Sequence, residues 1–421
     1  MKRSMQTRAV TAVLAASSIA LAACSSSGGG SGDDGSQAGS PAAQGKKATG
    51  APVTIGYLIP DSGPEANPQV APGLKAGLDY INNHGGINGR PLQALECHTD
   101  ASAAKETSCA NNFVQKKVVA VLDGFDRGIA DSLPVYKAAK IPVLGNVAQN
   151  AVADTDTSGT YYSLGPANAV YAIAPLVAFK KLGKTKIAYG LNDVPAQHTY
   201  ADKFLVPVAK QLGISMNAIY YNDTSPNFSV VAATAQSSGA QVLGVVKLTT
   251  PSQCQQFINS SRQAGFNGTL LAGNCVGVEQ LGANSKDVYT YQNNFFPAMS
   301  KYLPANLQAD VKVMDEATKG IASDKKGFFT YEDFATMMDF VRITSKLKTI
   351  DAATVMAALK GLKDYQGFAG PKLTCGGTVF PGTSACSNKL ILSVSMGDGT
   401  LKPTGADEGG FTAVDPGLVP K

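Results

Sequence analysis

Short apolar runs alternate with amphipathic segments along most of this chain, and the clearest example lies in residues 118–150. Residues 118–122 form a β-branched apolar run that is long enough for a buried strand. Residues 129–140 carry apolar side chains near helical spacing, and residues 141–144 form a second apolar run, which Gly145 ends. This order predicts a βαβ unit with a parallel sheet and a right-handed crossover. The loops after both strands would lie at one sheet edge, where ligands bind in open α/β folds.

The alternation forms two consecutive sets, and each set can build its own sheet. The first set has predicted strands at 53–59, 92–97, 118–122, 141–144 and 161–164, and helices at 70–83, 103–116 and 129–140. The second set has predicted strands at 186–189, 214–221, 241–246, 269–272 and 288–292, and helices at 170–182, 198–212, 230–237 and 253–264. We expect Pro207 to kink or divide its helix.

The last part of the chain departs from this alternation. Helices are predicted at 306–318, 330–346 and 352–362, the last with Asp351 as a good N-cap. A strand is predicted at 389–394, and the Gly/Pro-rich tail is expected to be weakly structured. Extra helices after two βα sets indicate that the chain returns to the first lobe before it ends.

The N-terminus is typical of a signal peptide. Lys2, Arg3 and Arg8 form a basic region, and residues 9–20 form an apolar core that is too short for an ordinary transmembrane span. No later stretch is long and apolar enough to span a bilayer.

The segment ends in Leu-Ala-Ala-Cys at residues 21–24, which resembles the lipobox of bacterial lipoproteins. The resemblance implies removal of a signal peptide at 1–23 and lipid on the sulfur of Cys24. The alternative is a plain signal peptide followed by a coincidental cysteine. Residues 24–51 are rich in Ser and Gly and predict a flexible tether, which favours the lipid anchor.

The composition suits an ordinary globular protein of two or three domains, with 421 residues of which 44% are hydrophobic and 16% charged. Loss of the three basic residues of the signal peptide would lower the formal net charge of +5 by three. The chain has no dense basic run, so nucleic-acid binding gets no support.

Six cysteines remain once Cys24 is set aside, and export makes disulfides permissible. Six cysteines allow fifteen pairings. Proximity in the sequence favours Cys97–Cys109, Cys254–Cys275 and Cys375–Cys386. The alternative is buried free thiols.

No constellation for catalysis stands out. The three histidines, His84, His98 and His198, have no metal-ligand spacing, and the nucleophile-elbow, phosphate-loop and zinc-protease motifs are absent from the sequence. One G-x-G-x-x-G match lies at residues 30–35, in the tether and with no strand before it. We therefore expect no catalytic residues, no metal and no cofactor, and we favour a binding protein over an enzyme.

Two stretches carry a resemblance to a known family. They are GYLIP at residues 56–60 and GLDYINNHGGINGR at residues 77–90, and a strand that ends near Asp100 supports them. They resemble the opening of the type I periplasmic binding proteins, and within these the branched-chain amino acid (Leu/Ile/Val) receptors of ABC importers. The similarity extends, with decreasing clarity, from about Val53 to the C-terminal strand.

The resemblance implies an α/β fold of two Rossmann-like lobes with parallel sheets, joined by a hinge of three crossovers. The expected lobes are 52–165 plus about 298–385, and 166–297 plus about 386–421. A small molecule would bind between the lobes and stabilise the closed form, which a permease with its ATPase then recognises. We expect a monomer that is extracytoplasmic and lipid-anchored to the bacterial cell membrane through Cys24.

The resemblance implies that the ligand-binding positions of the family can be matched to this sequence one residue at a time. The first-lobe loops imply contacts from Ser62, Asn67, Asp126 with Arg127, Val147 and Gln149. The second lobe implies His198 or Tyr200, Thr250 and Asn274, and a late aromatic position falls on Phe329 or Tyr331.

Three of these positions depart from the amino acid pattern. Asp126 replaces a Ser that faces the ligand carboxylate, Gln149 replaces a Thr, and Asn274 replaces the Glu that pairs with the ligand ammonium. An Asp there would repel a carboxylate unless Arg127 offsets it. The site is therefore not expected to bind leucine in the family's usual way.

Each candidate also has a structural alternative. Asp126 could cap the helix that begins near Gly128, Arg127 could be a solvated loop charge, Tyr200 could belong to the lobe core, Asn67 could only form a turn, and Asn274 could only end its strand.

The leading hypothesis is a solute-binding lipoprotein of an ABC importer for a small polar solute, with amino acid-like molecules among the candidates. The rival is a ligand-sensing receptor on the same fold that signals instead of delivering. A fused signalling module would favour that rival, and the sequence shows none.

Overall fold

The computed structural model describes residues 47–63, 66–222, 224–245, 248, 251–275 and 277–420. The predicted signal peptide, the lipidation of Cys24, most of the tether and the candidate Thr250 therefore lie outside the described residues. Among the described residues, no helix is long and apolar enough to cross a membrane.

The first lobe is built on a six-stranded parallel sheet with the order β13-β5-β4-β3-β1-β2. Its strands are β1 (Val53–Pro60), β2 (Leu92–Thr99), β3 (Val121–Asp123), β4 (Val143–Gly145), β5 (Tyr161–Pro166) and β13 (Ala385–Ser387). Its helices are α1 (Val70–Asn83), α2 (Ala103–Gln115), α3 (Ile129–Ala139), α4 (Ala151–Asp154), α11 (Phe328–Thr344) and α12 (Ala352–Lys360).

The side chains of β1 alternate between the two faces of this sheet, and both faces are buried. Tyr57 and Ile59 pack into the cluster that contains α1 and α11, whereas Leu58 packs with α2 and α3. Phe113 of α2 lies so close to Gly56 that a Cβ atom there would meet its ring at 2.5 Å. Helices therefore cover both faces, as a parallel sheet requires.

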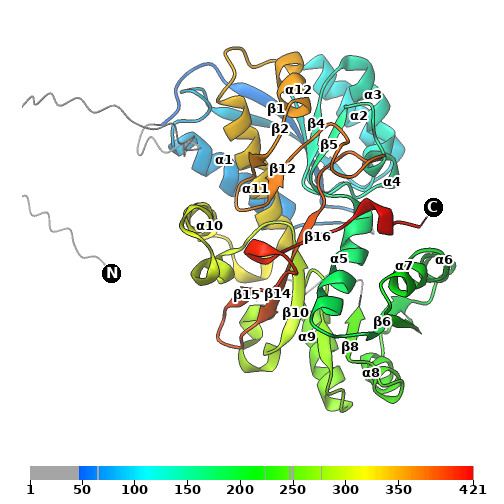
Figure 1. Cartoon of the computed structure of the whole chain (residues 1–421). Helices are drawn as coiled ribbons and strands as arrows, with labels where there is room; N and C mark the ends of the chain where they lie inside the picture. The colour runs from blue at the N-terminus through cyan, green and yellow to red at the C-terminus, as the bar shows by residue number, and fades with distance from the viewer. Residues whose placement is uncertain are drawn as a thin grey trace, which may run out of the picture. The chain divides into compact units, whose positions relative to one another are not determined.

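The second lobe is built on an eight-stranded mixed sheet with the order β15-β14-β10-β9-β8-β6-β7, and β16 also pairs with β14. Its strands are β6 (Lys186–Asn192), β7 (Ser215–Tyr221), β8 (Val242–Val245), β9 (Thr269–Leu271), β10 (Val288–Gln292), β14 (Lys389–Ser395), β15 (Leu401–Pro403) and β16 (Phe411–Ala413). Its α-helices are α5 (Asn168–Lys181), α6 (Pro195–Tyr200), α7 (Val206–Gln211), α8 (Phe228–Ser237) and α9 (Pro251–Gln263). Figure 1 shows β6, β8, β10 and β14 in this lobe.

The remaining elements are short except for α10. They are α10 (Ala305–Thr318), the hairpin of β11 (Tyr365–Gln366) and β12 (Lys372–Leu373), the π-helical segment η1 (Ala201–Leu205), and the 3-10 segments η2 (Val278–Ser285), η3 (Pro297–Tyr302), η4 (Ser323–Lys325), η5 (Glu408–Gly410) and η6 (Pro416–Leu418).

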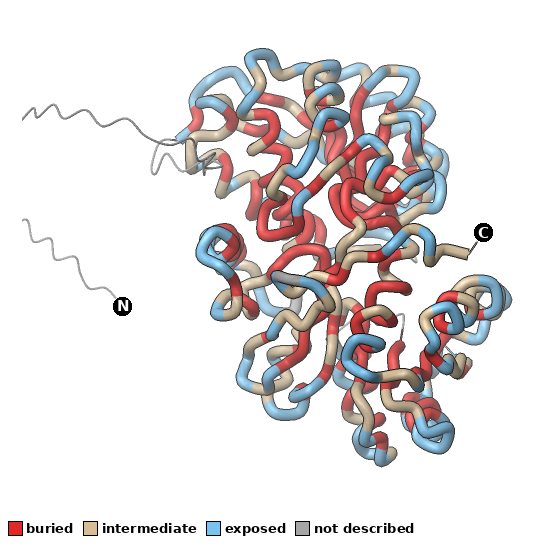
Figure 2. The backbone as a smooth tube through the Cα atoms, in the orientation of Figure 1, coloured by how far each residue is buried: buried red, intermediate tan, exposed pale blue. Residues whose placement is uncertain are grey.

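The chain passes between the two sheets three times. It crosses from β5 to α5, returns after β10 toward α10 and α11, and crosses again from β13 to β14. The strands and the inner faces of the helices are the buried parts of the chain, as Figure 2 shows. The fold is thus the α/β arrangement of two lobes and three crossovers that the family resemblance implies.

Pro207 interrupts its helix as expected. The predicted helix over 198–212 is divided into α6, η1 and α7, and η1 has π-helical geometry just before Pro207. Proline has no N–H to donate to the carbonyl four residues earlier, and a π-helical turn is one way to accommodate that loss.

The C-terminal tail differs from its prediction. It was expected to be weakly structured, but β15 and β16 both pair antiparallel with β14. The pairing satisfies backbone groups of β14 that a bare edge strand would leave open.

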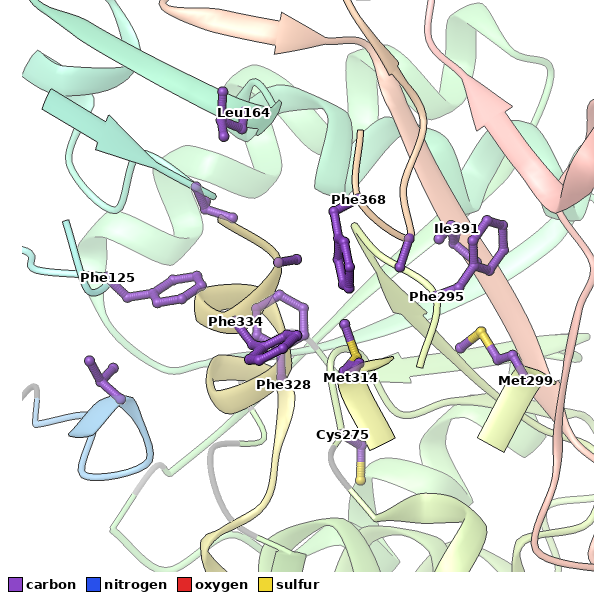
Figure 3. Packing of buried hydrophobic residues seen from close by; sticks show 14 of the residues in the cluster. Phe125, Leu164, Cys275, Phe295, Met299, Met314, Phe328, Phe334, Phe368 and Ile391 are labelled. Carbon is purple, nitrogen blue, oxygen red and sulfur yellow. The ribbon is translucent and has the colours of Figure 1, made fainter. Parts of the chain in front are cut away.

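The three expected disulfides are present, and they join Cys97 to Cys109, Cys254 to Cys275, and Cys375 to Cys386. The first ties β2 to α2, and the third ties the segment after β12 to β13. Figure 3 shows Cys275 as a member of the hydrophobic cluster in which Phe334 packs edge-on against Phe368 at 5.7 Å between ring centroids.

Candidate functional site

A cavity of about 260 Å³ lies where the strand ends of the second lobe meet loops of the first lobe. Val147 and Gln149 follow β4, and Phe328 begins α11. The other lining residues belong to the second lobe, and they are Asn168, Tyr171, Ala172, Tyr189, Tyr200, Leu205, Val245, Leu271, Asn274 and Tyr291. Both lobes therefore contribute walls to one cavity.

Four tyrosines dominate the second-lobe wall, and each comes from a different element. Tyr171 lies on α5, Tyr189 on β6, Tyr200 on α6 and Tyr291 on β10. The rings of Tyr171 and Tyr291 are 5.9 Å apart between centroids. Burial raises the pKa of Tyr291 to about 12 and also raises the pKa of Tyr189 and Tyr200, so these hydroxyls stay protonated at neutral pH.

Three of these hydroxyls have no hydrogen-bond partner among the described residues. Tyr171 donates its hydroxyl hydrogen to Oδ1 of Asn293 over 2.7 Å. No hydrogen bond within the described part of the chain uses the hydroxyls of Tyr189, Tyr200 or Tyr291. The wall therefore offers neutral groups that can both donate and accept.

Charged side chains are absent from the described lining of this cavity. A smaller adjoining space of about 30 Å³ shares Asn274, Tyr291 and Phe328 with it and carries Glu279 and Lys326. Burial raises the pKa of Glu279 above its ordinary value. Among the described lining residues, charged side chains therefore occur only in the adjoining space.

Polar side chains connect the cavity to the crossovers. Asn293 follows β10 and donates from Nδ2 to Oδ1 of Asn146 over 2.6 Å. Asn146 donates in turn to Oδ1 of Asn294 over 3.0 Å. Glu332 of α11 accepts from the backbone N–H groups of Asn293 and Asn294 through Oε1, at 2.9 and 3.2 Å. Burial raises the pKa of Glu332 to about 8.

Four of the residues predicted to bind ligand line the main cavity, namely Val147, Gln149, Tyr200 and Asn274. Tyr331 lines the adjoining space and packs against Phe296 at 4.8 Å between ring centroids. The contact of each of them with a ligand stays a prediction.

The other candidates lie outside the lining of both spaces. Ser62 donates to the carbonyl oxygen of Thr99 over 3.0 Å, and Asn67 donates to that of Phe125 over 3.2 Å. His198 is stacked on Tyr220 at 3.7 Å between centroids, and Phe329 packs edge-on against Phe125 at 4.8 Å.

Asp126 is fully buried, and its placement favours the structural alternative. Its Oδ1 accepts from the backbone N–H of Gly128, directly before α3, over 2.8 Å, and its Oδ2 accepts from the hydroxyl of Thr99. Arg127 next to it is exposed, and its carbonyl oxygen accepts from Asn150 over 3.0 Å. Contact of the Asp126 carboxylate with a ligand stays a prediction, and the bonds to Gly128 and Thr99 favour the helix-cap alternative.

Asp126 instead belongs to a buried acidic group in the first lobe. Tyr161 donates to Oδ2 of Asp123 over 2.6 Å, and burial together with Asp126 raises the pKa of Asp123 to about 7. Burial and the same neighbour raise the pKa of Glu106 above its ordinary value. No group of three or more His, Cys, Asp or Glu in the described ranges could hold a metal ion.

Sequence reasoning missed most of the tyrosine wall. Tyr189 and Tyr291 lie inside predicted strands, and Tyr171 lies inside a predicted helix, so their patterns indicated only core positions. The available signal was the presence of Tyr in two strands of the second set, in the middle of β6 and next to the carboxyl end of β10.

The family model described as periplasmic binding protein matches residues 52–379. A search of curated proteins found no match.

Solved structures resemble this chain at low identity. An extracellular ligand-binding receptor from Verminephrobacter eiseniae is 19% identical with a TM-score of 0.60, over 83% of this chain and 99% of that one. The branched-chain amino acid transporter substrate-binding protein LivJ from Streptococcus pneumoniae, solved with isoleucine, is 14% identical with a TM-score of 0.62, over 87% and 100%. A fatty acid ABC transporter substrate-binding protein from Thermomonospora curvata is 14% identical with a TM-score of 0.60, over 89% and 94%.

The matched family model spans most of the described chain, and the two lobes, the three crossovers and the cavity at the strand ends accompany it. The chain therefore belongs to the periplasmic binding proteins, in the type I group that includes the branched-chain amino acid receptors of ABC importers.

Proposed function

We propose that this protein is the extracytoplasmic solute-binding subunit of an ABC importer. It captures a small polar solute between its lobes and presents it to a permease and its ATPase, without catalysing a reaction. The observation that carries the proposal is the cavity walled by Val147, Gln149 and Phe328 on one side and by second-lobe strand ends on the other. A ligand that touches both walls stabilises the closed arrangement of a hinged protein.

Two lobes move about the hinge in this proposal. One consists of residues 52–165 plus about 298–385, and the other of residues 166–297 plus about 386–421. The polar contacts of Asn146, Asn293 and Asn294 lie where the chain passes between these bodies. The proposed form is a monomer, which is sufficient for binding because one chain supplies both walls of the cavity.

Ligand binding is tested with the full-length protein in a thermal-shift screen of amino acids, sugars, organic acids and aromatic compounds. A ligand at 100 times its Kd should raise the free energy of unfolding by about 2.7 kcal/mol. A screen in which no solute stabilises the protein would count against the proposal. Mass spectrometry of molecules that co-purify with the protein gives an independent answer.

A transport assay distinguishes delivery of the solute to a permease from a signalling function. Proteoliposomes that contain the proposed permease and its ATPase should accumulate the solute only when the binding protein is present. Binding without any stimulated uptake would favour the signalling receptor.

The lipid anchor is part of the same proposal. Cys24→Ser should abolish incorporation of radiolabelled palmitate and release the protein from the membrane fraction. Palmitate incorporation that survives this change would contradict an anchor on Cys24.

A further inference from the structure

We propose that the ligand is an aromatic compound with oxygen substituents, whose ring enters the second-lobe wall among Tyr189, Tyr200 and Tyr291. Its oxygen atoms hydrogen-bond the hydroxyls of these tyrosines. This inference rests on the proposed function and names the substrate class of the same cavity.

The need for oxygen atoms on the ligand follows from the tyrosine hydroxyls. The hydroxyls of Tyr189, Tyr200 and Tyr291 have no hydrogen-bond partner among the described residues, although all three residues line the cavity. A purely hydrocarbon ligand would remove water from these groups and leave them unpaired, which costs free energy. Ligand oxygen atoms restore the lost hydrogen bonds.

The need for a ring follows from the shape and chemistry of the wall. Aromatic side chains favour edge-to-face and offset contacts with another ring beyond the contribution of buried area. Phe328 begins α11 on the opposite side and adds a fifth aromatic side chain to the lining. A cavity of ~150 Å³ already holds benzene, so about 260 Å³ accommodates a ring with substituents.

An aliphatic zwitterion fits this wall less well. The ammonium of an amino acid needs a carboxylate or several strong acceptors once water is excluded, whereas tyrosine hydroxyls can donate to the oxygen atoms of a carboxylate or a phenol. The described lining of the main cavity offers only Gln149, Asn168, Asn274 and tyrosine hydroxyls as polar side chains. Asn274 is also neutral where the amino acid receptors carry a Glu.

The test compares four probes by isothermal titration calorimetry on the full-length protein. The probes are 4-hydroxybenzoate, cyclohexanecarboxylate, octanoate and L-leucine. Cyclohexanecarboxylate has a ring of similar size without aromatic character, and octanoate represents an alkyl chain. We expect 4-hydroxybenzoate to bind at least tenfold more tightly than each of the other three.

Tyrosine variants locate the binding. Tyr200→Phe and Tyr291→Phe keep the ring and remove the hydroxyl, and each should weaken 4-hydroxybenzoate about three- to tenfold. Tyr220→Phe is the matched control, since Tyr220 lies in the same lobe, stacks on His198 and lines neither space. Ala172→Trp fills the cavity and should abolish binding while the circular dichroism spectrum stays native.

The outcomes separate this inference from the proposed function. Two outcomes would overturn the ligand class and still leave a solute-binding protein. One is tighter binding of octanoate, leucine or cyclohexanecarboxylate than of 4-hydroxybenzoate. The other is an unchanged affinity for 4-hydroxybenzoate in both Tyr→Phe variants. Failure of these four probes and of every solute in the broad thermal-shift screen overturns both.

Discussion

Asn293 donates a hydrogen bond from Nδ2 to Oδ1 of Asn146 over 2.6 Å, although the two residues are 147 positions apart in the sequence. Asn146 directly follows β4 of the first lobe, and Asn293 directly follows β10 of the second. Both are nearly fully buried, with exposed fractions of 4% and 2%. The pair therefore fixes one crossover against the first sheet, next to the wall that carries Tyr171.

Removal of the Asn146 side chain should destabilise this crossover. Asn146→Ala removes the partner of Nδ2 of Asn293 and of Oδ1 of Asn294, and an unpaired buried polar group costs about 1–3 kcal/mol. We expect a loss of that size in the free energy of unfolding, measured by urea denaturation. The control is Asn217→Ala on β7, where the side chain is only partly buried. Equal stability of the two variants would show that the crossover does not depend on the Asn146 amide.

The pH dependence of stability should report on Glu332 in the same network. Burial raises its pKa from 4.5 to about 8 in the folded protein. Between these values the folded state binds the proton more tightly than the unfolded state does, so the free energy of unfolding falls as the pH rises from 4.5 to 8. A single group contributes up to about 1.4 kcal/mol per pH unit within that window.

Glu332→Gln isolates this contribution. The variant keeps an acceptor for the N–H groups of Asn293 and Asn294 and cannot ionise. The free energy of unfolding of this variant minus that of the unmodified protein should be larger at pH 8 than at pH 5, as measured by urea denaturation at both values. Glu316→Gln on the exposed side of α10 should leave the difference unchanged. A wild-type slope that persists in Glu332→Gln would assign the pH dependence to other groups, such as Asp123 or Asp339.

The sequence predicted most elements because their signals are local. The bounds of α1 at Val70–Asn83 are those expected from apolar spacing, and Asp351 caps α12 with the predicted side-chain bond to the N–H of Thr354. Helix periodicity, capping and chain breaking depend on neighbouring residues only.

The site was less predictable because it depends on tertiary geometry. Phe125 has a positive φ of 64°, which is uncommon for a residue with a bulky side chain, and the following Asp126 is fully buried. No pattern in this loop signals that turn. Tyr189 could not be separated from core residues by periodicity, since its accessibility depends on where α6 and η1 pack over β6.

The ion pair of Asp310 and Arg342 should stabilise the contact between α10 and α11. Nη1 of Arg342 donates to Oδ2 of Asp310 over 3.0 Å, and Nη2 donates to Oδ1. Asp310 also accepts from the backbone N–H of Ala369 over 3.0 Å. Asp310→Ala leaves a largely buried guanidinium unpaired and should lower the free energy of unfolding by about 3 kcal/mol.

The matched control is an exposed pair on α1. Lys75 and Asp79 lie four residues apart, with 78% and 61% of their side chains exposed. Lys75→Ala should change stability little, because exposed pairs are screened by solvent. Chemical denaturation of both variants under one buffer condition compares them directly, and a similar effect of both changes would contradict the distinction between buried and exposed pairs.

The Cys97–Cys109 disulfide should stabilise the first lobe by restricting the unfolded chain. It closes a loop with a sequence separation of 12 residues and ties β2 to α2. A disulfide across a loop of this length contributes about 3 kcal/mol in the chain-entropy description. The double change Cys97→Ala with Cys109→Ala should therefore lower the free energy of unfolding by about 2–4 kcal/mol. Urea denaturation with and without dithiothreitol provides the check, because reduction should destabilise the unmodified protein more than this variant, which keeps only the other two disulfides. An equal effect of the reductant on both proteins would show that Cys97–Cys109 adds no stability.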